Sequence, residues 1–115
     1  MTVIKIDTRP IVDWNTFHEV FAATLGFPGF YGRNMNAWID CMSYVDDAGA
    51  GMSSITVEPG GLLVLQLDYV NEFAARCPEQ YQAIAEGAAF VNWRRMEQGQ
   101  EAVLALSYYK QPPRW

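Results

Sequence analysis

Hydrophobic and polar residues alternate at the start of the chain and then follow a helical spacing. Residues 2–7, TVIKID, alternate and are rich in β-branched side chains, so they predict a short strand. Further along, large apolar side chains recur at steps of three and four residues, at Trp14, Phe17, Phe21 and Leu25. This spacing predicts an amphipathic helix, which Asp13 can cap at its start and Gly26 can end.

A second amphipathic helix is predicted after a compact loop at residues 27–32, which contains two glycines and a proline. Asn34 is suited to cap this helix, which should run to about Tyr44. Three side chains at positions i, i+3 and i+7 are expected to face the core, namely Met35, Trp38 and Met42. The opposite face is expected to be polar and exposed, and its members are Asn36, Asp40, Ser43 and Asp47.

The second half of the chain contains two further strands and two further helices. Residues 62–67, LLVLQL, are apolar nearly throughout, as in a central strand that is buried on both faces. Residues 102–107, AVLALS, predict the last strand. Between them, residues 71–76 predict a short helix and residues 79–98 a longer one. Residues 46–54 are expected to form a flexible connection.

Strands that are separated by helical segments favour a mainly parallel sheet, because parallel strands need long crossover connections. The sequence therefore predicts an α/β fold, as a small three-layer-like domain with helices packed on the sheet. Residues 1–115 are expected to form a single domain. Residues 55–67 have a strand–turn–strand pattern and can add an edge hairpin beside the sheet. Residues 110–115 are expected to form a frayed tail.

The composition is acidic, with a net charge of −5. Such a chain repels phosphate backbones, so nucleic acid is not an expected partner, whereas a basic protein is. The first residues lack a basic segment followed by an apolar run, and no apolar stretch is long enough to span a bilayer. With only two cysteines, Cys41 and Cys77, and no signal peptide or membrane span expected, we expect a cytoplasmic protein.

Candidate catalytic groups are few. His18 is the only histidine and is expected to be a partly exposed structural residue, while Cys41 is expected to be a small buried one. Spacing alone does not exclude a Cys–His catalytic pair. A small enzyme that uses His18 or Cys41 is therefore one hypothesis, beside the two binding functions described below. No phosphate-binding glycine motif and no cluster of metal ligands is present in the sequence. We therefore predict no cofactor, no metal and no enzymatic activity.

Residues 30–42, FYGRNMNAWIDCM, carry the most specific pattern: two aromatics, a glycine, an asparagine before a helix, and an Asp-Cys pair. This segment resembles the signature of the barstar family, whose type member inhibits the ribonuclease barnase inside the cell. The runs LLVLQL and AVLALS are similar to the family's middle and closing strands. The resemblance implies a three-stranded parallel sheet packed by helices. It also implies that the second helix and the loop before it block a nuclease active site.

The resemblance carries over to single residues of the predicted contact surface. Asp40 matches the family's main anchoring aspartate, and a carboxylate there can occupy the place of a substrate phosphate in a basic nuclease. Ser43 shares its helix face. Other positions on or near the implied surface are Phe30, Tyr31, Asn34, Asn36, Ile39 and Tyr44. Asn34 can equally be only a helix cap, and Tyr31 can be only a core residue.

Two functions follow from these residues. The first is a protein inhibitor that blocks a basic ribonuclease or nuclease toxin. The second is a protein-binding adaptor of the same fold whose partner is not a nuclease. The neutral Asn36 and the positive Arg94 favour the second, because the family has acidic residues at the corresponding places. The oligomeric state and the role of residues 46–61, which can form an edge hairpin or lie over the contact surface, are left open.

Overall fold

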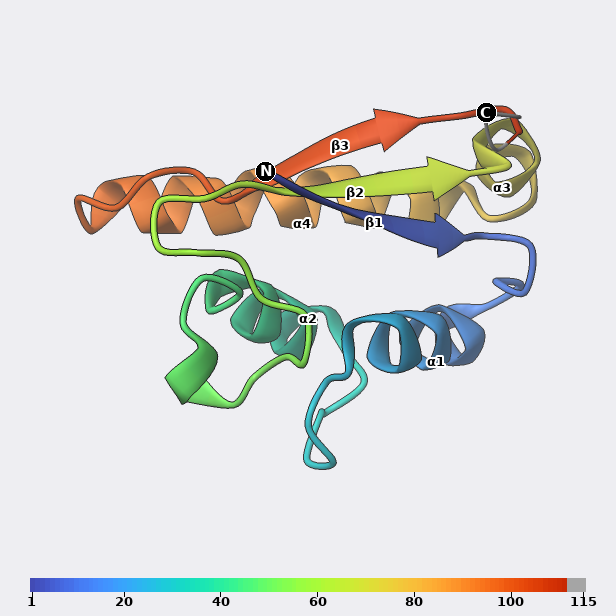
Figure 1. Cartoon of the computed structure of the whole chain (residues 1–115). Helices are drawn as coiled ribbons and strands as arrows, with labels where there is room; N and C mark the ends of the chain where they lie inside the picture. Colours follow the sequence, from blue (N-terminus) through green and yellow to red (C-terminus); the bar gives the residue numbers. More distant parts are fainter. Residues whose placement is uncertain (112–115) are drawn as a thin grey trace.

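The computed structural model describes residues 1–111, and three segments of that range form a parallel sheet (Figure 1). The strands are β1 (Thr2–Asp7), β2 (Leu63–Asp68) and β3 (Leu104–Tyr108). The sheet order is β1-β2-β3, so β2 is the central strand and pairs in parallel with both neighbours. The predicted α/β fold with a three-stranded parallel sheet is therefore confirmed. Part of the tail predicted at residues 110–115, namely 112–115, lies outside the described residues.

The helices begin and end close to the predicted positions. They are α1 (Trp14–Leu25), α2 (Met35–Ser43), α3 (Val70–Arg76) and α4 (Pro78–Glu97), and a short 3₁₀ helix, η1, spans Ala48–Ala50. The Asp13 side chain accepts a hydrogen bond from the backbone N–H of Thr16, which caps α1 as predicted. Gly26 ends this helix in the left-handed conformation, with φ of 65°.

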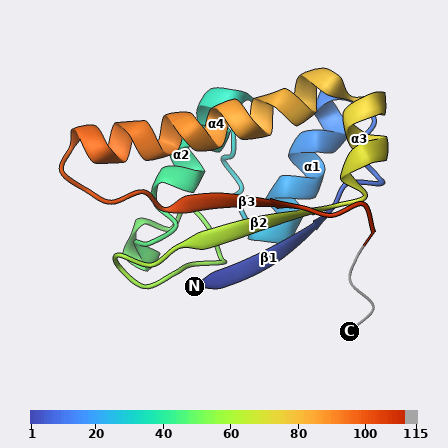
Figure 2. The same cartoon turned by 90° about the horizontal axis from the view of Figure 1, so that it is seen from above.

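The helices α1, α2 and α4 lie on the same side of the sheet (Figures 1 and 2). Alternation along the strands agrees with this arrangement, because Ile4 and Ile6 pack into the core while Val3 and Lys5 are exposed. The arrangement therefore has two layers, which differs from the three-layer-like one expected. The strand β2 is nonetheless buried at five of its six positions, since β1 and β3 flank it.

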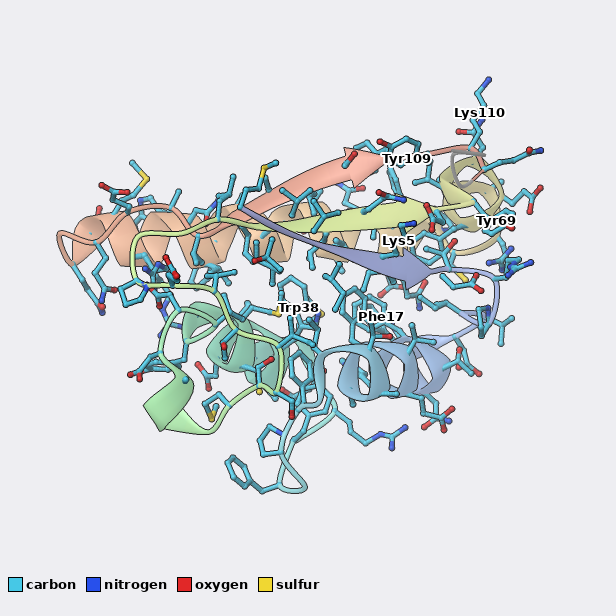
Figure 3. The ribbon with its side chains drawn as sticks, viewed as in Figure 1. Lys5, Phe17, Trp38, Tyr69, Tyr109 and Lys110 are labelled. Atoms are coloured by element: carbon cyan, nitrogen blue, oxygen red, sulfur yellow. The ribbon has the colours of Figure 1, made fainter. Side chains whose placement is uncertain are left out.

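The core lies between the sheet and the helices, where Phe17 of α1 and Trp38 of α2 point toward the strands (Figure 3). Both side chains are fully buried, as predicted for the apolar faces of these helices. The helices α2 and α4 approach closely at Gly87, where an added Cβ would lie 2.8 Å from the Trp38 ring. Because Gly87 has no side chain, α4 can pack directly against the Trp38 ring of α2.

The edge hairpin predicted at residues 55–67 is wrong, because residues 55–57 form no strand. Their backbone donors are used elsewhere: the N–H of Ile55 bonds the carbonyl of Leu25 at the end of α1. The N–H of Val57 bonds the carbonyl of Val45, just after α2. Residues 53–57 therefore follow the ends of the two helices and do not extend the sheet.

Candidate functional site

A groove of about 320 Å³ opens between α2 and the loop before it. Five of the predicted contact residues line this groove, namely Phe30, Tyr31, Asn34, Asn36 and Asp40. Met52, from the segment after η1, also lines it. Residues 46–61 thus reach the predicted contact surface, which is the second of the two possibilities left open by the sequence. Met52 was missed because nothing in its local sequence marks it as a surface contact.

Asn34 caps α2, as predicted from its place before the helix. Its Oδ1 accepts a hydrogen bond of 2.8 Å from the N–H of Ala37, and its Nδ2 donates to the carbonyl of Gly32. Arg33, immediately before it, has a φ of 54°, in the left-handed region that non-glycine residues seldom occupy. The cap and this turn set the angle at which the loop enters the helix.

The loop is attached to α1 through an aromatic cluster around His18. The Tyr31 hydroxyl and the His18 Nδ1 form a hydrogen bond, and Trp14 and Phe17 pack against the imidazole. His18 is 3% exposed, so the prediction of a partly exposed residue is wrong. Burial and the nearby charge of Arg33 lower the pKa of His18. Burial raises the pKa of Tyr31, whose hydroxyl therefore stays protonated at neutral pH.

Two side chains of the groove project into solvent. Phe30 is 75% exposed. The Asp40 side chain is 55% exposed, and its Oδ1 lies 3.5 Å from the Nη1 of Arg94 on α4. An ion pair at this distance between partly exposed side chains contributes little to stability in water, so the Asp40 carboxylate is available to a partner.

The other predicted contact residues lie outside this groove. Ser43 was expected on the exposed face, but it is buried, and its hydroxyl donates to the Ile39 carbonyl one turn earlier. Ile39 lines a separate apolar groove between α2 and α4. Tyr44 is exposed beside a third pocket, where α2 ends. The structure thus divides the predicted surface into a groove at the start of α2 and two flanking areas.

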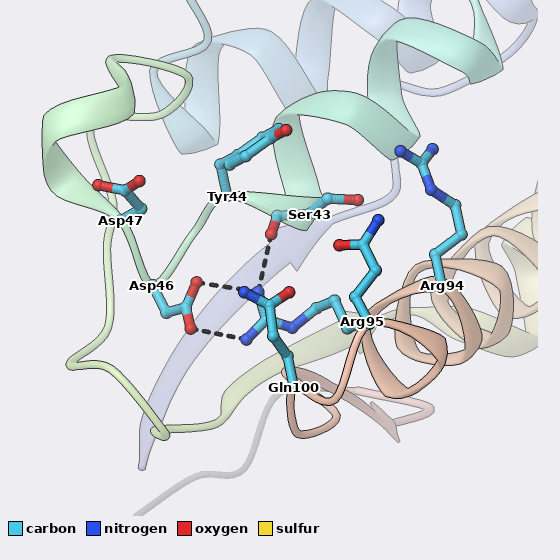
Figure 4. Close-up of a pocket in the computed structure, with 8 residues that line it drawn as sticks. Ser43, Tyr44, Asp46, Asp47, Arg94, Arg95 and Gln100 are labelled. Carbon is cyan, nitrogen blue, oxygen red and sulfur yellow. Dashed lines mark hydrogen bonds and ion pairs between the residues drawn. The ribbon is translucent and has the colours of Figure 1, made fainter.

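The third pocket contains a buried ion pair that sequence reasoning missed (Figure 4). The guanidinium of Arg95 donates to both carboxylate oxygens of Asp46, at 2.6 and 3.0 Å. It also donates to the carbonyls of Ser43 and Glu101. Arg95 therefore connects the end of α4 to the end of α2 and fixes where α2 stops.

Catalytic chemistry has little support at this site. Cys41 is buried as predicted, and burial raises the pKa of its thiol to about 11, with the Asp40 charge adding to the effect. A thiol that stays protonated at neutral pH is a poor nucleophile. Within residues 1–111, no group of three or more His, Cys, Asp or Glu side chains is placed to hold a metal ion. In the same range, no helix is both long and apolar enough to cross a bilayer.

Comparison with known protein families gives one finding. The model of the family described as Barstar (barnase inhibitor) matches residues 1–105 of the 115 in the chain. The matched range covers β1, β2, the first two residues of β3, the helices α1 to α4 and the groove at the start of α2. A comparison with curated proteins finds no match.

Proposed function

This chain belongs to the barstar family of barnase inhibitors, and from that premise we propose that it blocks the active site of a basic ribonuclease or nuclease toxin. The proposed contact surface is the groove lined by Phe30, Tyr31, Asn34, Asn36 and Asp40, together with the flanking residues Ile39 and Tyr44. We propose that it acts in the cytoplasm, without a cofactor and without catalysing a reaction.

The exposed carboxylate of Asp40 is the observation that carries this proposal. A nuclease cleft holds phosphate with arginine and lysine side chains, and a carboxylate pairs with such groups when water is excluded. Asp40 projects from the side of α2 at the edge of the groove, and Phe30 projects from the loop on the same groove. An anionic residue beside an exposed aromatic suits the centre of a protein interface, where a few such residues supply most of the binding energy.

The rigidity of this surface supports tight binding, because a loop that is already ordered loses less entropy when a partner binds. Asn34 holds the start of α2, and the hydrogen bond between Tyr31 and His18 ties the loop to α1. Arg33 adds a second attachment, since its Nη2 donates to the Asn15 side chain at 2.8 Å.

Affinity capture tests the proposal. The wild-type chain, used as bait in an extract of its own cells, should recover a basic nuclease and inhibit it, more strongly at low salt than at high salt. Asp40→Lys should abolish the inhibition while leaving the thermal midpoint nearly unchanged. Glu72→Lys is the matched control, because Glu72 is an exposed acid on α3, which contributes no residue to the groove. Equal inhibition by the Asp40 and Glu72 variants would exclude Asp40 from the mechanism.

The adaptor function remains as a second candidate, and one observation favours it. Arg94 lies beside Asp40, and Asn36 on the same face is neutral, so the surface is less acidic than a pure phosphate mimic. Recovery of a protein partner without nuclease activity, in a complex that Asp40→Lys disrupts, would establish this second function and refute the first.

A further inference from the structure

We propose that Arg94 determines the specificity of the inhibitory surface, and that the matching nuclease carries a carboxylate beside its basic cleft. This inference rests on the proposed function, because it concerns the partner of the same surface. It adds a charge pattern that the partner must have: cations opposite Asp40, and an acidic residue opposite Arg94.

Arg94 and Arg95 are neighbours in sequence but differ in their surroundings (Figure 4). The Arg95 side chain is 6% exposed and its guanidinium bonds Asp46 and two backbone carbonyls. The Arg94 side chain is 37% exposed, points toward α2, and forms no hydrogen bond with any part of the described chain. Among residues 1–111, its one ionic contact is the 3.5 Å approach to Asp40. Arg95 is thus structural, whereas the donors of Arg94 are available to a partner.

The position of Arg94 beside Asp40 is set by the packing of α4 on α2. Phe90, one turn earlier on α4, lies 5.9 Å from the Arg94 guanidinium and also lines the apolar groove between the two helices. Trp93 packs against Phe90, with ring centroids 5.8 Å apart. Both aromatic rings are about half exposed. The guanidinium of Arg94 lies over the Phe90 ring, which is a cation–π contact, and Trp93 packs against that ring.

The charge of Arg94 matters most after a partner has excluded water from the surface. In the free protein, water screens the pair with Asp40. In a complex, a partner that presents only cations would pair with Asp40 but would bury Arg94 against like charge, which is unfavourable. A partner that presents a carboxylate next to its cations satisfies both residues. Specificity arises because the wrong partner meets a repulsive group.

Barnase is a suitable probe, because it is the ribonuclease that the description of this family names. Barnase activity would be titrated with the wild-type chain, with Arg94→Ala and with Arg94→Glu. Lys5→Glu is the matched control: it changes the net charge as Arg94→Glu does, but Lys5 is exposed on the face of the sheet that the helices leave open. Thermal midpoints of all variants should stay close to that of the wild type, since Lys5 is exposed and Arg94 is partly exposed and makes no hydrogen bond within the described residues.

We expect inhibition of barnase to improve about tenfold for Arg94→Ala and about a hundredfold for Arg94→Glu, with little change for Lys5→Glu. Equal inhibition by all variants would overturn the inference, and if wild type inhibits strongly it would still support the proposed function. If Lys5→Glu improves inhibition as much as Arg94→Glu does, the improvement comes from net charge alone, and the inference about Arg94 is also overturned. If no variant inhibits barnase, Arg94 is not the barrier and the inference fails, whereas the capture experiment decides the proposed function separately.

Discussion

The Tyr31 hydroxyl is hydrogen-bonded to Nδ1 of His18, so a buried imidazole on α1 holds the loop that precedes α2. The residues are 13 positions apart, and the contact attaches the loop to α1 together with the hydrogen bond from Arg33 to Asn15. Because the Tyr31 ring also packs on Phe27, one end of the loop is enclosed by aromatic side chains. The exposed Phe30 is consequently carried on a well-supported segment.

Acidification should destabilise the protein through His18. The pKa of His18 is lowered in the folded state, so the unfolded chain binds the proton more readily than the folded chain does. The free energy of unfolding is therefore greatest above about pH 6.5, the pKa of a free histidine, and falls as the pH is lowered below it. If His18 stays neutral when folded, the free energy of unfolding falls by up to about 1.4 kcal/mol between pH 7.5 and 5.5. Urea unfolding at the two pH values measures the difference.

His18→Phe is the control for this effect, because it keeps an aromatic ring and removes the only histidine. The variant will be less stable at both pH values, since the Tyr31 hydroxyl loses its partner. Its stability should nonetheless change little between pH 7.5 and 5.5. A loss as large as that of the wild type would assign the acid sensitivity to other groups.

Elements whose signals are local could be predicted from the sequence. The apolar spacing from Trp14 to Leu25, with Asp13 before it and Gly26 after it, defines α1 within a single stretch of chain. The same holds for Asn34 at the start of α2 and for the alternation in β1. Five of the eight predicted contact residues line one groove for the same reason, because they are close in sequence, in the loop before α2 and on its first turns.

Features that depend on distant partners could not be predicted. The pair of Arg95 and Asp46 joins residues 49 positions apart, and neither side chain has a local pattern that marks it as buried. Val57 lies in a β-branched stretch, yet its N–H bonds Val45, so tertiary contacts override its strand propensity. His18 was misjudged because its burial depends on Tyr31, which a loop brings back onto α1.

The pair of Arg95 and Asp46 should be essential for stability. Asp46→Ala leaves a buried guanidinium without its carboxylate, which should lower the free energy of unfolding by about 3 kcal/mol. Chemical denaturation measures this loss. Asp47→Ala is the matched control, because Asp47 is exposed and only caps η1, so its loss should cost about 1 kcal/mol or less. Similar costs for the two variants would show that the buried pair contributes no more than a surface cap.

Gly87→Ala should not stabilise the protein, although Gly87 lies within α4. Alanine is favoured over glycine inside a helix by about 1 kcal/mol. The added Cβ, however, would lie 2.8 Å from the Trp38 ring and 3.1 Å from the Met35 methyl group. Overpacking of this kind costs about 1–3 kcal/mol, so Gly87→Ala should be neutral to destabilising by about 2 kcal/mol in thermal or urea unfolding.

A double-mutant cycle isolates the contact between Gly87 and Trp38. In a Trp38→Phe background the smaller ring leaves space for the Cβ, so Gly87→Ala should cost less there than in the wild type, or should stabilise the protein. Equal costs in both backgrounds would locate the penalty somewhere other than this contact.

Phe30 should contribute to binding without contributing to folding. Its side chain is largely exposed at the edge of the groove, so Phe30→Ala should change the free energy of unfolding by no more than about 0.5 kcal/mol. Truncation of an aromatic residue at the centre of an interface costs about 2 kcal/mol or more, which corresponds to at least about a thirtyfold loss of affinity for the nuclease recovered by capture. Val3→Ala is the matched control, since Val3 is an exposed apolar residue on the open face of the sheet. If the two variants bind the nuclease equally well, Phe30 lies outside the interface, and the inhibitory surface must be centred on the α2–α4 side of Asp40.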